Sequence, residues 1–123
     1  MGKILIVEDS STTRSLIRAV IEDLGDEFDA YEAQTGFEAL KILPSESFDL
    51  IITDINMPDI NGLELISFVK NNDAYKHIPM IIVSTERSEE DKKRGMSLGA
   101  DAYVTKPFKA EELQEQIKRV LIV

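Results

Sequence analysis

Three continuous apolar runs constrain the fold of this chain more than any other feature. They cover Ile4–Val7, Leu50–Ile52 and Met80–Val83, and none of them alternates with polar residues. Because a strand with one face in water alternates, unbroken runs of this length predict strands buried on both faces, as in a parallel sheet covered by helices. Two weaker candidates, Phe28–Ala33 and Ala102–Val104, have less apolar content and suit the edges of such a sheet.

Helical patterns fill the intervals between the runs. Each interval carries apolar residues at helical spacing, or a recognisable helix start or stop. The first interval has Leu16, Ile17, Val20, Ile21 and Leu24 on one face, before Gly25, and the second has Thr35 with Glu38 as a capping box, before Pro44. The third has Asn61 with Glu64 as a second box, followed by Leu65, Ile66 and Val69. The fourth has Ser88 with Asp91, before Gly99, and the last has Leu113, Ile117, Val120 and Leu121.

The resulting order, strand then helix five times, predicts an α/β fold. Such alternation is typical of a doubly wound parallel sheet with right-handed crossovers and helices on both faces. A chain of 123 residues fits one domain, which we expect to span residues 1–123. The helix expected over 88–99 has almost no apolar side chains over 88–95, so it should have few core contacts and move easily.

Composition excludes several classes of function. The chain has no cysteine, so disulfides, thiolate metal sites and catalytic thiols are absent. Its net charge of −9 argues against direct binding to nucleic acid and permits partners with positive surfaces, although such a charge more often serves solubility alone. The first apolar run is too short for a signal peptide or a membrane span, so we expect a cytoplasmic protein without membrane insertion. Glycine-rich nucleotide motifs and a Ser-His-Asp arrangement are also absent.

Polar residues follow four of the five expected strands. Glu8 and Asp9 follow the first, Asp54 the third, Ser84 the fourth and Lys106 the fifth. Each has an ordinary explanation alone, such as a turn or a helix cap, but loops at the carboxyl ends of parallel strands form the ligand site of such sheets. Clustered carboxylates repel one another and therefore favour a bound cation. Oxygen ligands favour Mg²⁺ over softer metals, and their small number favours Mg²⁺ over Ca²⁺, which takes more protein ligands.

This set of groups predicts phosphoryl transfer to a carboxylate. A carboxylate beside Mg²⁺ can attack a phosphoryl group, and Asp54 is the candidate nucleophile. The ammonium of Lys106 would neutralise charge on the transferring oxygens, and the hydroxyl of Ser84 would donate a hydrogen bond to one of them.

The motifs around these residues resemble those of response-regulator receiver domains, and among them the stand-alone, chemotaxis-type CheY-like family. The resemblance covers nearly the whole chain and rests on ILIVEDS (4–10), DLIITDINMPDINGLEL (49–65), IIVSTE (81–86) and GADAYVTKPF (99–108). It implies a flavodoxin-like (βα)5 fold whose strands have the order 2-1-3-4-5.

The resemblance also implies a role for each site residue. Asp54 is the expected phosphoacceptor and Lys106 the phosphate-binding amine, joined to Pro107 by a cis peptide bond. Ser84 and Tyr103 are the expected switch residues, with Tyr103 turning inward as Ser84 moves to the phosphate. The expected Mg²⁺ ligands are Asp9, Asp54, the backbone carbonyl of Asn56 and, through water, Glu8.

The implied function is that of a two-component response regulator. A histidine kinase would supply the phosphoryl group from a phosphohistidine. The helix over 88–99, the strand over 102–104 and the last helix would present a changed surface to a downstream protein, in chemotaxis or motility. A phosphatase is a further possible partner; we expect a monomer and leave a dimer open.

Three positions bear on the gain and loss of the phosphoryl group. Asn56 and Glu86 agree with chemotaxis-type relatives beside the path of the attacking water, which suggests quick self-dephosphorylation. Thr85 stands where relatives often have Ala or Gly, and its larger side chain would narrow the access to Asp54.

Three other interpretations remain open at this point. The chain could be a receiver cut from a longer regulator. It could be a small aspartyl-phosphate phosphohydrolase, although such an enzyme needs a second aspartate two residues after the nucleophile, where Asn56 stands. It could also be a binding module that works without phosphorylation, although such a module would be expected to have lost Asp54, Asp9 or Lys106.

Overall fold

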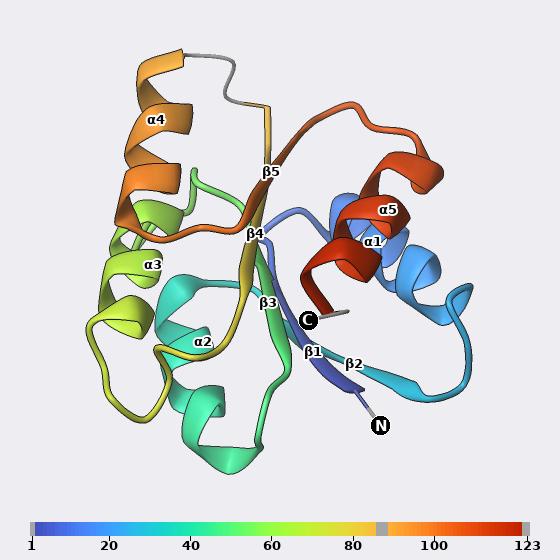
Figure 1. Cartoon of the computed structure of the whole chain (residues 1–123), viewed down its shortest axis with the longest axis horizontal. Coiled ribbons are helices and arrows are strands. Elements are labelled where there is room, and N and C mark those ends of the chain that lie inside the picture. The colour runs from blue at the N-terminus through green and yellow to red at the C-terminus, as the bar shows by residue number, and fades with distance from the viewer. Residues whose placement is uncertain (1, 86–88, 122–123) are drawn as a thin grey trace.

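A five-stranded parallel sheet forms the centre of the computed structural model, which describes residues 2–85 and 89–121 (Figure 1). The order of the strands is β2-β1-β3-β4-β5, as predicted, with the two weaker candidates at the edges. The strands are β1 (Gly2–Val7), β2 (Phe28–Ala33), β3 (Leu50–Thr53), β4 (Met80–Ser84) and β5 (Ala102–Thr105).

Helices cover both faces of the sheet, which explains the unbroken apolar runs. On one face lie α1 (Ser11–Glu22) and α5 (Ala110–Leu121), and on the other α2 (Gly36–Ile42), α3 (Gly62–Lys70) and α4 (Glu89–Leu98). Every residue of β3 and β4 is buried, and successive residues of each strand enter opposite halves of the core. The doubly wound fold predicted from the sequence is confirmed.

The buried face of α1 is narrower than the sequence pattern indicated. Ile17, Val20 and Ile21 are buried against the sheet, but Leu16 is 48% exposed and Leu24 lies beyond the end of the helix. The prediction that Leu16 belongs to the core face is therefore wrong. At about 100° per residue, Leu16 falls roughly 90° from the centre of the face formed by the other four residues.

Caps define the starts of α2 and α3. Asn61 and Glu64 form the complete capping box that the sequence predicted. At α2 the hydroxyl of Thr35 accepts the Glu38 N–H at 3.0 Å, but the Glu38 carboxylate accepts from the N–H of Gln34 instead of Thr35. The box predicted there is therefore only half formed. Pro44 lies in a 3-10 turn, Leu43–Ser45, directly after the end of α2.

The helix α4 has little core contact, as predicted. Gly95 is its one buried residue, and a Cβ there would collide with the end of the Ile82 side chain in β4. Gly99, with φ +120°, follows the last helical residue and is suited to the left-handed turn that ends the helix. The start predicted at Ser88 lies outside the described residues. None of the described helices has the length and apolar character that crossing a bilayer requires.

We predict that Leu16→Ala and Ile17→Ala differ sharply in their effect on stability. Truncation of the exposed Leu16 side chain should change the free energy of unfolding by no more than about 0.5 kcal/mol. Ile17 is 1% exposed, and its truncation should lower the free energy of unfolding by about 3 kcal/mol because it leaves a cavity. Urea denaturation of both variants measures the difference, and equal midpoints would contradict the assignment of the buried face.

Candidate functional site at the carboxyl edge of the sheet

Three carboxylates meet where β1 and β3 end. Val7 pairs with Thr53 in the parallel register of these strands, so the residues that follow them, Glu8 and Asp54, leave the sheet side by side. The Asp54 N–H donates to the carbonyl of Val7 at 3.0 Å, which continues the ladder by one step. Carboxylate oxygens of Glu8, Asp9 and Asp54 all lie within 4.8 Å of one another.

The ammonium of Lys106 reaches this cluster from the end of β5. Its Nζ lies 2.7 Å from Oε1 of Glu8 and 3.3 Å from Oδ2 of Asp54. Its backbone N–H donates to the carbonyl of Ser84 at 2.9 Å, and the peptide bond to Pro107 is cis, as predicted. Burial lowers the pKa of Lys106, but the hydrogen bond that it donates to Glu8 and the charges of Asp54 and Glu8 outweigh burial and raise the pKa above its usual value.

Glu8 and Asp54 are buried, whereas Asp9 is exposed. Glu8 is 1% exposed, and this burial raises its pKa despite the hydrogen bonds that it accepts from Lys106 and from the Ser10 N–H. Oδ1 of Asp54 accepts the N–H of Ile55 at 2.7 Å, while Oδ2 faces Lys106. The site therefore combines two shielded carboxylates with one that stands in solvent.

The other predicted residues occupy different positions around this edge. Ser84 is fully buried at the end of β4, and Tyr103 is half-buried on β5, where it packs against the core on the side of α2, α3 and α4. Asn56 and Thr85 are exposed in the loops after β3 and β4, and Glu86 lies outside the described residues.

Gly62 fits its position because the loop after β3 passes against the start of α3. A Cβ there would overlap the carbonyl oxygen of Asp54 and lie 2.9 Å from Cα of Ile55. The Gly62 N–H also donates to the carbonyl of Ile55 at 2.8 Å. The first residue of α3 thus sets how closely the helix approaches the backbone that carries Asp54.

Two supporting residues were not predicted from the sequence. Nη1 of Arg14 donates to the carbonyls of Glu8 and Asp9. The carboxylate of Asp59 accepts the N–H groups of Gly36 and Phe37 and so ties the loop after β3 to the start of α2. The sequence did offer a signal for Asp59, because this residue stands directly after the Asn-Met-Pro segment that follows Asp54 and Ile55. Arg14 had none, because its partners become neighbours only in the folded chain.

The donor set at this edge suits a hard divalent ion. The cluster offers carboxylate oxygens alone, without histidine or cysteine, and Mg²⁺ takes one or two carboxylates together with water and phosphate oxygens. The spacing of the carboxylates therefore agrees with the ion that the sequence predicted.

Comparisons with known proteins identify the family. Residues 4–118 match the family model of the response regulator receiver domain. The chain belongs to this family. The chemotaxis protein CheY of Pseudomonas aeruginosa is 39% identical over 118 residues, which cover 96% of this chain and 94% of the relative. A CheY homolog of Campylobacter jejuni is 38% identical over 120 residues, which cover 97% of this chain and 92% of the relative.

Solved structures of receiver domains agree with the fold. The chemotaxis protein CheY4 of Vibrio cholerae superposes with a TM-score of 0.90 at 36% identity, covering 98% of this chain and 99% of that one. A putative response regulator from Chloroflexus aurantiacus gives a TM-score of 0.92 at 27% identity, with 99% and 98% coverage. This chain is thus a receiver domain of the CheY-like type, and such domains are phosphoacceptor switches.

We predict that Gly62→Ala destabilises the receiver domain by about 1–3 kcal/mol, because the new methyl group meets backbone atoms that cannot move alone. Gly95→Ala is the matched control, since its methyl group meets only the flexible end of Ile82. Urea denaturation compares the two variants. Equal stability of the two variants would contradict this prediction, because it would show that the loop after β3 can shift to make room for the methyl group.

Proposed function

We propose that this receiver domain takes a phosphoryl group from the phosphohistidine of a histidine kinase onto Asp54, with Mg²⁺ bound, and thereby changes its surface for a partner. The observation that carries the proposal is the meeting of Glu8, Asp9, Asp54 and Lys106 at one edge of the sheet. These residues come from three strand ends that are far apart in the sequence.

In the transfer step, an oxygen of Asp54 attacks the phosphorus in line. The new O–P bond forms as the P–N bond breaks, and the electron pair of that bond returns to the imidazole nitrogen of the kinase. Lys106 exchanges part of its pairing with Glu8 and Asp54 for an oxygen of the phosphoryl group. Mg²⁺ held by Asp9 and Asp54 would neutralise charge on the same oxygens.

We assign the metal ligands from the family resemblance and from this arrangement. Asp9, Asp54 and the backbone carbonyl of Asn56 would hold Mg²⁺ directly, and Glu8 through water. The hydrogen bond that Glu8 already accepts from Lys106 supports an indirect role, because one of its oxygens is engaged.

The switch would run from Ser84 to the surface formed by α4, β5 and α5. Ser84 donates to a phosphoryl oxygen, and Tyr103 moves toward the space that Ser84 leaves. A ligand shifts an equilibrium only if it makes different contacts in the two states, and the new contacts to Ser84 and Lys106 provide that difference. Gly95 is the one buried residue of α4, so this helix can move more easily than the others, which supports the choice of this surface.

Three of the four proteins named above are chemotaxis proteins, so we infer a target in chemotaxis or motility. We infer that a phosphatase partner would act at the same edge of the sheet, because it has to reach Asp54. We infer that the chain acts as a switch and not as a hydrolase of small phosphate esters, since Asn56 stands where such an enzyme needs a second aspartate.

Incubation with Mg²⁺ and acetyl phosphate should add one phosphoryl group to the protein, as measured by intact mass. EDTA should abolish the gain because the charge of the transferring oxygens is then uncompensated, and Asp54→Asn should abolish it because the nucleophile is lost. Asp73→Asn is the matched control: this exposed aspartate follows α3 and pairs with Lys76, so its substitution should leave the mass gain intact. A full gain in Asp54→Asn would overturn the assignment of the acceptor.

The movement of Tyr103 can be followed by fluorescence, since the chain contains no tryptophan. In Tyr103→Trp, Mg²⁺ with acetyl phosphate should shift the emission to shorter wavelength as the indole turns into the protein. The same variant carrying Asp54→Asn should show no shift. An unchanged spectrum at full phosphorylation, confirmed by mass, would remove residue 103 from the switch.

A further inference from the structure

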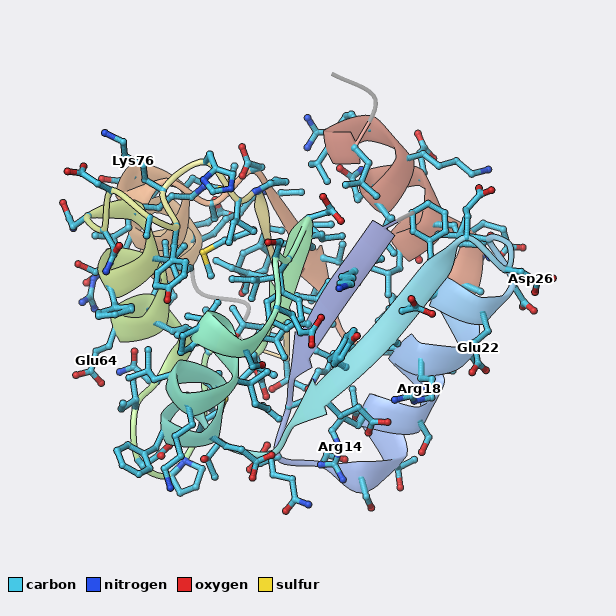
Figure 2. The ribbon with its side chains drawn as sticks, turned by 90° about the horizontal axis from the view of Figure 1, so that it is seen from below. Arg14, Arg18, Glu22, Asp26, Glu64 and Lys76 are labelled. Atoms are coloured by element: carbon cyan, nitrogen blue, oxygen red, sulfur yellow. The ribbon has the colours of Figure 1, made fainter. Side chains whose placement is uncertain are left out.

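Arg14 links the metal-ligand loop to the edge of the sheet. It lies in the first turns of α1, with a side chain only 12% exposed. Nη1 donates to the carbonyl of Glu8 at 2.9 Å and to that of Asp9 at 3.4 Å, while Nε donates to Oε1 of Glu32 in β2 at 3.0 Å. Figure 2 shows Arg14 and Arg18 along α1, beside β2. One guanidinium thus holds two carbonyls of the loop and a carboxylate of the neighbouring strand.

Glu32 is fixed from both sides. Its second oxygen accepts from Nε of Arg18 at 2.5 Å, and Arg18 also donates to the carbonyl of Ala30 at 3.1 Å. Burial alone would raise the pKa of Glu32, but the hydrogen bonds and charges of Arg18 and Arg14 outweigh it and lower the pKa. Glu32 therefore stays ionised and anchors Arg14 to a strand that is part of the sheet.

We propose that Arg14 is a positioning residue for Mg²⁺ binding: it holds the Glu8–Asp9 backbone so that both carboxylates face the ion before the ion arrives. This inference rests on the proposed function, because it assumes that Mg²⁺ binds at this edge. Arg14 itself contacts backbone carbonyls and Glu32, so it would act through the loop and not as a ligand of the ion.

The reason for such a contact is the repulsion within the site. Without an ion, the negative charges of Glu8, Asp9 and Asp54 favour a loop that moves Asp9 away, and Asp9 is the exposed member of the three. A loop held in place by its carbonyls loses less conformational freedom when the ion binds, so the affinity is higher. Supporting partners of metal ligands typically contribute about 10–100-fold in affinity.

Arg18 provides a matched control within the same cluster. It carries the same charge on the same helix and pairs with the same Glu32, but its backbone contact is Ala30 in β2 and not the metal-ligand loop. A loss shared by both arginines would come from charge or from Glu32. A loss confined to Arg14 would come from its hold on Glu8 and Asp9.

The test is Mg²⁺ titration by isothermal calorimetry, without phosphodonor, on the parent, Arg14→Met, Arg14→Lys and Arg18→Met. We expect Arg14→Met to weaken Mg²⁺ binding about tenfold and Arg18→Met to change it less than about twofold. Arg14→Lys should resemble Arg14→Met, because one ammonium cannot serve both carbonyls and Glu32. If Arg14→Met does not fold, as judged by circular dichroism, Arg14→Lys decides alone.

Phosphorylation rates give a second readout. In Arg14→Lys, the Mg²⁺ concentration for half-maximal phosphorylation by acetyl phosphate should rise, while the rate at saturating Mg²⁺ stays near the parent's. Parent-like affinity in Arg14→Lys, or an equal loss in Arg18→Met, would overturn the inference and leave the proposed function standing. A parent protein that binds no Mg²⁺ would overturn both.

Discussion

The parallel pairing of β1 with β3 is the constraint on which this site depends. It brings Glu8 beside Asp54 although the two strands are separated in the chain by a complete strand and two helices. Two unit charges at 4 Å repel by about 4 kcal/mol at an effective dielectric constant of 20. Lys106, 98 positions from Glu8, offsets part of that repulsion and leaves negative charge in excess. The excess negative charge favours the binding of a cation at this edge. A bound cation would in turn favour the negatively charged phosphoryl group.

The individual helices contribute unequally to the rigidity of this edge. In one layer, α1 and α5 bury three residues each against the sheet. In the other layer, α3 buries five residues, whereas α4 buries Gly95 alone. Rigid elements therefore hold the carboxylates, and the most weakly packed helix lies next to β5 and Tyr103. This distribution suits a switch, since elements that move come from the least stable part of a fold.

Most of the fold could be predicted from the sequence because apolar runs and capping residues act locally. The strands, their burial on both faces and the weak α4 all followed from neighbouring residues. Leu16 was misjudged because it was grouped with its apolar neighbours without regard to its angle, roughly 90° from the centre of their face, which places it at the exposed margin. The strand ends located Asp54 and Lys106, but the contacts of Arg14 and the overlap at Gly62 depend on how separate elements approach one another, which a pattern of residues does not specify.

The cluster of Arg14, Glu32 and Arg18 also has a consequence for the free rim of the sheet. Among the described strands β2 pairs with β1 alone, and the unpaired side of an edge strand can template the addition of a strand from another molecule. Arg18 already occupies the carbonyl of Ala30, and the charged side chains of Asp29 and Glu32 stand in the same strand. Any chain that tried to extend the sheet here would have to displace an arginine and strip water from carboxylates, so the geometry that steadies the ion-binding loop also discourages aggregation.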